Sequence, residues 1–266
     1  MQVIPLSPFD LGLASLLVLA LAGLSFHLGL GLSRSLLISG LRTTIQLLLV
    51  GLVLKALFTY VHLRWLALMA CFMVLMAGRE VMRRQKHRLT GWWGFGIGTF
   101  SMFVCAFSVT VFCLKVVIQP VPWYEPQYSI PLLGMLLGNC MNGLALSIDH
   151  LTGSVTKQKA EIEGRLILGN DWRQAIASTR RDSLRVGLIP IINAMAAAGI
   201  ISLPGMMTGQ ILAGNSPVDA VKYQILIMFL IAAVTGFGAV LSVELATRRL
   251  FDDRQRLRLD RLTPSP

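Results

Sequence analysis

The stretch "VKYQILIMFLIAAVTGFGAVLSVEL" occupies residues 221–245 and decides the fold class. Its charged residues, Lys222 and Glu244, stand next to its two ends, and the residues between them are apolar or uncharged. A helix of roughly 20 such residues crosses the hydrocarbon core of a bilayer. The whole chain has 266 residues, of which 55% are hydrophobic and only 14% are charged. These features predict an all-α, polytopic membrane protein.

Six further apolar runs precede this one, so we predict about seven transmembrane helices. They cover residues 11–26, 36–58, 65–81, 95–118, 130–148, 187–203 and 221–245. Most of the 24 Lys and Arg residues fall in one set of alternate connections, while the opposite set holds little besides Arg64 and Lys222. Because cytoplasmic connections are rich in Lys and Arg, we expect the N-terminus outside and the C-terminus in the cytoplasm. The net charge of +11 is then a signal of topology, and we expect no nucleic-acid partner.

Two charged segments lie on the expected cytoplasmic side. Residues 149–186 carry charges of both signs, and apolar residues recur there with helical spacing around Ile162 and Ile176. Gly169 interrupts that pattern, which predicts two short amphipathic helices joined by a turn. Residues 247–266 form a basic tail, which we expect to be a helix or a frayed end that rests against the inner membrane surface.

The sequence contains no recognisable machinery for chemistry. It has no G-x-x-x-x-G-K-[ST] phosphate-binding loop and no H-E-x-x-H zinc motif. The four cysteines lie in apolar segments without a C-x-x-C pair, so we read them as packing thiols. We therefore expect no catalytic residue and no cofactor bound by this chain. Energy for transport would enter through a partner that uses ATP and Mg, or through an ion gradient.

A polar stripe marks the second predicted span. Arg42 and Gln46 are four residues apart and share a helix face, with Thr43 beside them. One interpretation is that this stripe lines a translocation path or ties two helices together. The alternative is that Arg42 snorkels to the cytoplasm while Gln46 makes one hydrogen bond between helices.

Neutral ligand atoms gather on the fifth and sixth predicted spans. Side-chain amide oxygens and thioether sulfurs can escort a cation without holding it as tightly as carboxylates would. The alternative is tight packing with hydrogen bonds between helices, for which Gly134-x-x-x-Gly138 is suited. The candidates for the path are Met135, Asn139 and Asn142 in the fifth span and Asn193 in the sixth.

The uncharged segment "SLPGMMTGQILAGNSP", residues 202–217, separates the last two spans on the expected outer side. We interpret it as a short re-entrant helix that seals the outer end of the path. The alternative is an ordinary periplasmic loop. The predicted gate residues are Pro204, Gly205, Met206, Met207, Thr208, Gly209 and Gln210, of which the two methionines join Met135, Asn139 and Asn142 as candidate metal ligands.

Three stretches together resemble a known family. They are "LRTTIQLLLVGLVLKALF" (41–58), "IPLLGMLLGNCMNGLALSI" (130–148) and "IPIINAMAAAGIISLPGMMTGQILAGNSPVDAVKYQILIMF" (189–229). In these stretches the chain resembles the permease subunits of the Fet-type iron-export ABC transporters of bacteria, whose plant relatives include the permease of an aluminium-tolerance transporter. The resemblance covers nearly the whole chain and implies one transmembrane permease domain, residues 1–266, in the bacterial inner membrane.

The resemblance also implies partners and a cargo. It implies a homodimer of permeases bound to two copies of a separate cytoplasmic ATPase, and export of metal ions, with iron as the expected substrate. Importer permeases contact their ATPases through a loop in which a Gly follows a Glu by six residues, and Glu163 and Gly169 have that spacing, with Asp171 beside them. Beyond Gly169 the importer pattern is not kept, because the Ile-Pro step comes only at Ile189-Pro190, and the alternative is a solvated amphipathic loop. The alternatives are an ABC permease for another metal or small solute, an ATP-independent secondary carrier, and a membrane scaffold.

Overall fold

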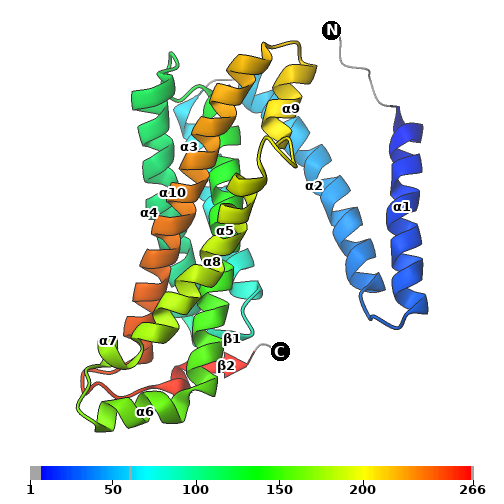
Figure 1. Cartoon of the computed structure of the whole chain (residues 1–266). Coiled ribbons are helices and arrows are strands. Elements are labelled where there is room, and N and C mark those ends of the chain that lie inside the picture. The colour runs from blue at the N-terminus through cyan, green and yellow to red at the C-terminus, as the bar shows by residue number, and fades with distance from the viewer. Residues whose placement is uncertain (1–6, 60–61, 265–266) are drawn as a thin grey trace.

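A computed structural model describes residues 7–59 and 62–264 of the chain, and most of them are helical. Most of the helices pack side by side into an elongated bundle (Figure 1). The elements are α1 (Pro8–His27), α2 (Ser33–Thr59), α3 (Leu63–Arg83), β1 (His87–Leu89), α4 (Trp92–Phe112), the π-helical turn η1 (Cys113–Ile118), α5 (Pro126–Lys157), α6 (Lys159–Ile167), α7 (Trp172–Ala175), α8 (Ala177–Ala197), α9 (Gly205–Leu212), α10 (Pro217–Leu250), the 3-10 turn η2 (Leu259–Arg261) and β2 (Leu262–Pro264).

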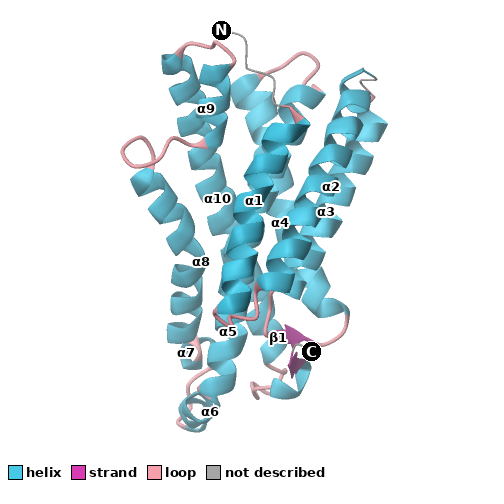
Figure 2. Ribbon diagram, turned by 90° about the vertical axis from the view of Figure 1, so that its right-hand side faces the viewer, coloured by secondary structure: helices cyan, strands magenta, loops and turns pink. Residues whose placement is uncertain are grey.

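Within the described ranges, six helices are long and apolar enough to cross a membrane: α1, α2, α3, α4 with η1, α5 and α10. Helix α5 lies at the centre and packs against α3, α4, α8 and α10. Helices α1 and α2 form a hairpin beside this bundle (Figure 1). The short helices α6 and α7 and the two strands lie at one end of the bundle, and α9 lies at the other (Figures 1 and 2).

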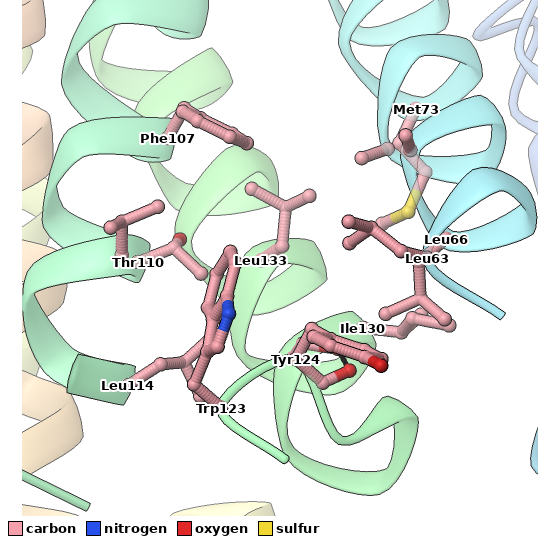
Figure 3. A pocket seen from close by; sticks show the side chains of 14 residues that line it. Leu63, Leu66, Met73, Phe107, Thr110, Leu114, Trp123, Tyr124, Ile130 and Leu133 are labelled. Atoms are coloured by element: carbon pink, nitrogen blue, oxygen red, sulfur yellow. Dashed lines mark hydrogen bonds between the residues drawn. The ribbon is translucent and has the colours of Figure 1, made fainter. Parts of the chain in front are cut away.

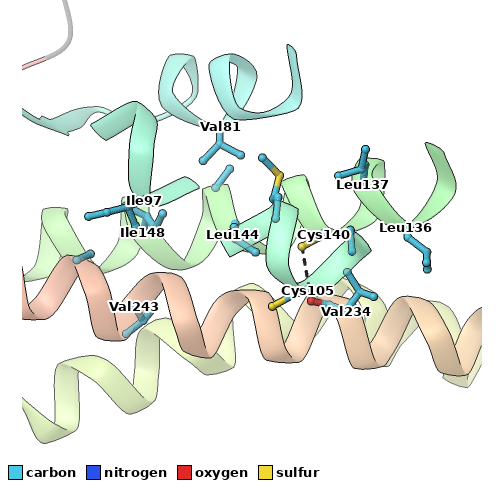
Figure 4. Packing of buried hydrophobic residues seen from close by; sticks show 14 of the residues in the cluster. Val81, Ile97, Cys105, Leu136, Leu137, Cys140, Leu144, Ile148, Val234 and Val243 are labelled. Atoms are coloured by element: carbon cyan, nitrogen blue, oxygen red, sulfur yellow. Dashed lines mark hydrogen bonds between the residues drawn. The ribbon is translucent and has the colours of Figure 1, made fainter. Parts of the chain in front are cut away.

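The core of the bundle is built from apolar side chains of α3, α4, α5 and α10 (Figure 4). Cys140 is fully buried there, and its thiol donates a hydrogen bond to the backbone carbonyl of Val234 over 3.5 Å. All four cysteines are free, and Cys105, Cys113 and Cys140 are buried, as expected of packing thiols. These three cysteines therefore act as packing thiols, whereas Cys71 is exposed and does not fit that expectation.

Small residues bring α5, α8 and α10 into close contact. A Cβ atom placed on Gly187 of α8 would lie 1.9 Å from Oγ of Ser147 and 2.7 Å from the carbonyl oxygen of Gly143, both on α5. One placed on Gly143 would lie 2.3 Å from Cγ2 of Thr235 on α10. The close approach predicted at Gly138 is not found, because the space around its position is open. The helices therefore touch most closely about one turn further along α5.

Helix α8 differs from the predicted sixth span, 187–203. It begins at Ala177, ten residues earlier, because Arg180 on its charged first half is held by Glu244 of α10. It ends at Ala197, before the expected stop at Pro204, because Gly199 adopts a φ of +81° that a helix cannot contain. The charged first half keeps α8 out of the set of six apolar helices, so the count of seven crossings and the orientation stay predictions.

The segments expected at the cytoplasmic side also differ in detail. Helix α5 continues through Lys157, α6 forms as predicted, and the second amphipathic helix is reduced to the single turn α7 before α8 begins. The tail is helical only as far as Leu250 and in the single turn η2, and it is not frayed, because β2 pairs in antiparallel fashion with β1, with Arg88 opposite Thr263. Backbone hydrogen bonds between β1 and β2 hold the tail against the bundle in spite of its many basic residues. Residues 265–266 lie outside the described residues.

Candidate functional site

A cavity of about 290 Å³ lies between α5, α9 and α10 at the α9 end of the bundle. We call it the α9 cavity. It brings together Met135, Met206 and Gln210, three of the residues predicted from sequence for the path and the gate. The lining also includes the uncharged polar residues Gln127, Tyr128, Asn215 and Tyr223. A solute in this cavity would meet the thioether sulfur atoms of methionine and the oxygen atoms of amide and phenol groups.

Helix α9 forms one wall of the cavity, and its ends follow from the sequence. Pro204 precedes the first turn in an extended conformation, and its carbonyl oxygen accepts a hydrogen bond from the Thr208 hydroxyl over 3.2 Å. After Leu212 the chain turns at Gly214, which has a φ of +92°. The predicted short helix is therefore present, and it packs against α10. Whether it dips into a membrane stays a prediction.

Other predicted path residues lie away from this cavity. Asn139 donates its side-chain amide to the carbonyl oxygen of Met135 one turn earlier, over 2.9 Å, and its side chain is exposed. Asn193 is exposed on α8. Among the gate residues, Gly205, Met207 and Gly209 are on α9 but do not line the cavity.

Asn142 belongs to a polar cluster that sequence reasoning missed. Its side-chain oxygen accepts a hydrogen bond from Nη1 of Arg84, over 2.6 Å, and Nε of Arg84 lies 3.3 Å from Oε1 of Glu80. Arg84 directly follows α3, while Asn142 is on α5. A basic residue just after a predicted span could have drawn attention to a polar partner on a neighbouring helix. The predicted face of Met135 and Asn142 is thus divided between the α9 cavity and this cluster.

The polar stripe on α2 stands apart from both sites. Arg42, Thr43 and Gln46 are exposed, and α2 contacts α1 but touches α5 only slightly. No residue of this stripe lines a described cavity of the main bundle. The structure therefore does not bring these residues together with Met135 or Asn142.

The predicted coupling residues gather around the turn after α6. We call residues 167–170 the α6 tip. Gly169 makes the turn with a φ of +91°, and Asp171 caps α7 by accepting a hydrogen bond from the backbone N–H of Gln174 over 2.7 Å. Glu163 lies one turn before the tip, 3.8 Å from Lys159. Ile167 and Leu168 project from the tip with 86% and 84% of their surfaces exposed.

The α6 tip is held on a rigid base. Nη1 of Arg165 donates to the carbonyl oxygen of Ala175 over 3.1 Å, which clamps α6 to α7. The backbone N–H of Trp172 donates to Oε1 of Gln255 over 3.2 Å, and the Trp172 ring packs on Phe251. The tail therefore supports the tip from behind. A groove of about 780 Å³ runs between them, with Glu163, Gly169 and residues 253–257 along it.

A third pocket is almost entirely apolar and contains no predicted site residue. It is a space of about 110 Å³ between α3, α4 and α5, lined by side chains such as Leu66, Met73 and Leu133 (Figure 3). Its one threonine, Thr110, donates its hydroxyl to the carbonyl oxygen of Ala106 in its own helix. The pocket therefore offers a solute no free polar group from that residue.

The described part of the chain holds no cluster of the side chains that usually bind a metal ion tightly. No group of three or more His, Cys, Asp and Glu side chains comes together among residues 7–59 and 62–264. The ligand atoms that do gather are the neutral ones of the α9 cavity. Such atoms favour passage over tight retention of a cation.

These features define the class of the protein, a multi-pass helical membrane protein that carries a polar cavity at one end and an exposed apolar turn at the other. The chain belongs to the uncharacterised protein family UPF0014, whose model matches residues 8–251. A UPF0014 membrane protein of Synechocystis is 39% identical over 93% of this chain and 95% of its own length.

Two further relatives carry more specific names. The probable iron export permease protein FetB of Escherichia coli is 32% identical over 93% of each chain. The UPF0014 membrane protein STAR2 of Oryza sativa is 35% identical over 90% of this chain and 82% of its own. The family resemblance seen in the sequence is confirmed by these matches. No solved structure matches the chain.

Proposed function

We propose that this chain is the permease subunit of an ABC transporter that exports metal ions, with iron as the cargo, and that a separate cytoplasmic ATPase drives it. The observation that carries the proposal is the α6 tip. Ile167 and Leu168 are large apolar side chains exposed together on a braced turn, and exposed apolar patches rimmed by polar residues mark contact sites with other proteins. The name of the Escherichia coli relative supports the cargo.

The arrangement suits mechanical coupling. Residues of the tip are linked through Arg165 to α7, and Arg180 at the start of α8 forms an ion pair with Glu244 of α10. Helix α8 in turn packs on α5 and α10, which line the α9 cavity. A pull on the tip would therefore reach α5 and α10 through packed helices. Two copies of the chain on two ATPase subunits would complete the transporter in the bacterial inner membrane.

The direct test is a titration of ATPase activity. The permease would be co-purified with a P-loop ATPase encoded beside it and reconstituted in lipid, and hydrolysis would be measured with Fe²⁺, Mn²⁺, Zn²⁺ and Al³⁺. We expect stimulation by Fe²⁺ above that of the other ions. Uphill transport by the reconstituted permease alone would contradict the proposal, and so would a failure to bind any such ATPase.

The α9 cavity provides a second prediction, for the substrate. Replacing both Met135 and Met206 with leucine keeps the volume of the cavity wall but removes the two sulfur atoms. We expect the concentration of Fe²⁺ that gives half-maximal stimulation to rise about tenfold, as loss of roughly 1.4 kcal/mol of binding implies. The matched control is Met207→Leu on the same helix, outside the cavity. An equal change in the control would count against a role of the cavity in metal passage.

A further inference from the structure

A separate cavity of about 440 Å³ lies where α4 begins and α10 ends. We call it the Trp93 cavity. Its charged lining consists of Arg248, Arg249, Arg261, Asp252 and Asp253. It shares Asp253 with the groove beside the α6 tip but no residue with the α9 cavity, and the proposed transport cycle uses neither Arg249 nor Arg261.

Most charges near this cavity are already neutralised. Nε of Arg248 lies 3.0 Å from Glu244. Asp252 accepts hydrogen bonds from the backbone N–H groups of Arg254 and Arg256 and pairs with the Arg256 guanidinium over 2.8 Å. Those bonds, foremost the one from the Arg256 backbone, lower the pKa of Asp252 and keep it ionised.

Two guanidinium groups are left without a carboxylate. Arg249 stacks on Trp93, with its guanidinium carbon 4.7 Å from the ring centre, and its buried Nε makes no hydrogen bond within the described chain. Nη1 of Arg261 donates to the backbone carbonyl oxygens of Arg249 and Phe251, over 2.7 and 3.3 Å. Neither side chain takes part in an ion pair among residues 7–59 and 62–264.

The nearby acid Asp260 does not compensate for them. Both of its carboxylate oxygens are held by Arg258, over 2.8 and 2.9 Å. This pairing with Arg258 lowers the pKa of Asp260 to about 2. Asp253 lines the cavity and takes part in no ion pair of the described chain. Two guanidinium groups outside any described ion pair, against one such carboxylate, leave one net positive charge in the cavity.

The place of the cavity in the bundle selects the source of an anion. Helices α4 and α10 are both long enough to span a membrane, and the cavity lies at the end of each. Trp92 and Trp93 stand at the first turn of α4 with 85% and 52% of their surfaces exposed. Tryptophan is enriched at the level of lipid headgroups, and basic pockets between transmembrane helices bind anionic headgroups.

We propose that the Trp93 cavity binds the phosphodiester of an anionic phospholipid, with Arg249 and Arg261 as the ligands of the phosphate. A planar guanidinium such as that of Arg249 can meet two phosphate oxygens with two parallel N–H donors. One net positive charge matches the single negative charge of a phosphodiester better than the two charges of free phosphate. Because Phe251 and Arg261 belong to the tail that supports the α6 tip, bound lipid would steady the end of the bundle at which the tip lies.

Lipid binding to the full-length permease tests this proposal. The dissociation constant for phosphatidylglycerol would be measured by native mass spectrometry or fluorescence, with phosphatidylcholine and inorganic phosphate as the other two ligands. We expect binding of phosphatidylglycerol, and an Arg249→Gln variant is expected to bind it about tenfold more weakly, the loss of a charged hydrogen bond. Arg249→Lys keeps the positive charge but lacks the two parallel N–H donors, so its affinity for phosphatidylglycerol is expected to lie between those of the native chain and Arg249→Gln.

The matched control is Arg181→Gln, which removes one exposed positive charge from α8 and is expected to leave the affinity unchanged. Equal affinity for phosphatidylcholine would overturn the proposal. So would an unchanged affinity in both Arg249 variants, or an equal loss in the control. Displacement of the lipid by low-millimolar inorganic phosphate would assign the site to a soluble anion instead. None of these outcomes depends on the identity of the transported ion.

Discussion

Replacing Ile167 and Leu168 together by aspartate is expected to abolish metal-stimulated ATP hydrolysis by the permease–ATPase complex. The two side chains have 86% and 84% of their surfaces exposed, so the substitution removes no contact from the core of the bundle. In a docked complex the same positions would be buried, and two carboxylates placed there would lose apolar contact and add unpaired charge. Burial of a Leu or Ile side chain contributes about 1.5 kcal/mol or more, so loss of both costs about 3 kcal/mol and weakens binding of the ATPase about a hundredfold.

The measurement is the affinity of the ATPase for the permease, read by co-purification and by titration of hydrolysis. Ala177→Asp is the matched control, because this exposed residue opens α8 at the same end of the bundle and tolerates an acid at a helix N-terminus. The control is expected to keep full activity. Normal transport by the double variant would show that the α6 tip is not where the ATPase acts.

Glu163 leads to a weaker expectation. It is half-buried beside the groove and pairs with Lys159 at a distance of 3.8 Å, so its charge is shared within α6. We expect Glu163→Ala to lower transport several-fold and to leave ATP hydrolysis largely in place, since a single exposed ion pair contributes less than about 1 kcal/mol. Unchanged transport would remove Glu163 from the coupling contact without touching the apolar anchors.

The helical bundle could be predicted from the sequence because each membrane-spanning helix corresponds to a long run of apolar residues. The runs at 95–118 and 221–245 lie within described helices, and Gly169 makes the predicted turn. The extent of α8 could not be predicted in the same way. Its first half is charged, and the partners that hold it as a helix, such as Glu244 for Arg180, are distant in sequence.

Individual residues of the candidate site could be predicted from the sequence, but not which of them lie together in the structure. Helical spacing places Met135 and Asn142 on one face of α5, yet their partners differ, because Met206 of α9 meets the first and Arg84 meets the second. Such partners come from other helices, and the spacing of residues along one helix shows which of them share a face but not what that face contacts. The strand pairing of the tail escaped prediction for the same reason, since β1 and β2 are short and far apart in the chain.

The second large effect is expected on stability, from Gly187→Ala. The new Cβ atom would lie 1.9 Å from Oγ of Ser147 and 2.7 Å from the carbonyl oxygen of Gly143, and neither distance is compatible with van der Waals radii. The Ser147 hydroxyl can rotate away, but the carbonyl is part of α5, so α8 has to move outward. Overpacking of this kind costs about 3 kcal/mol in the free energy of unfolding.

Denaturation in mixed micelles would measure this change, with Gly138→Ala as the matched control. The position of Gly138 on α5 is open, so alanine there is expected to raise stability by up to about 1 kcal/mol through its helix propensity. Adding Ser147→Gly to Gly187→Ala removes the nearer of the two contacts and is expected to restore part of the loss. Because α8 joins the α6 tip to the wall of the α9 cavity, an outward shift should also weaken coupling. A Gly187→Ala variant as stable as the native chain would mean that α5 and α8 do not approach this closely.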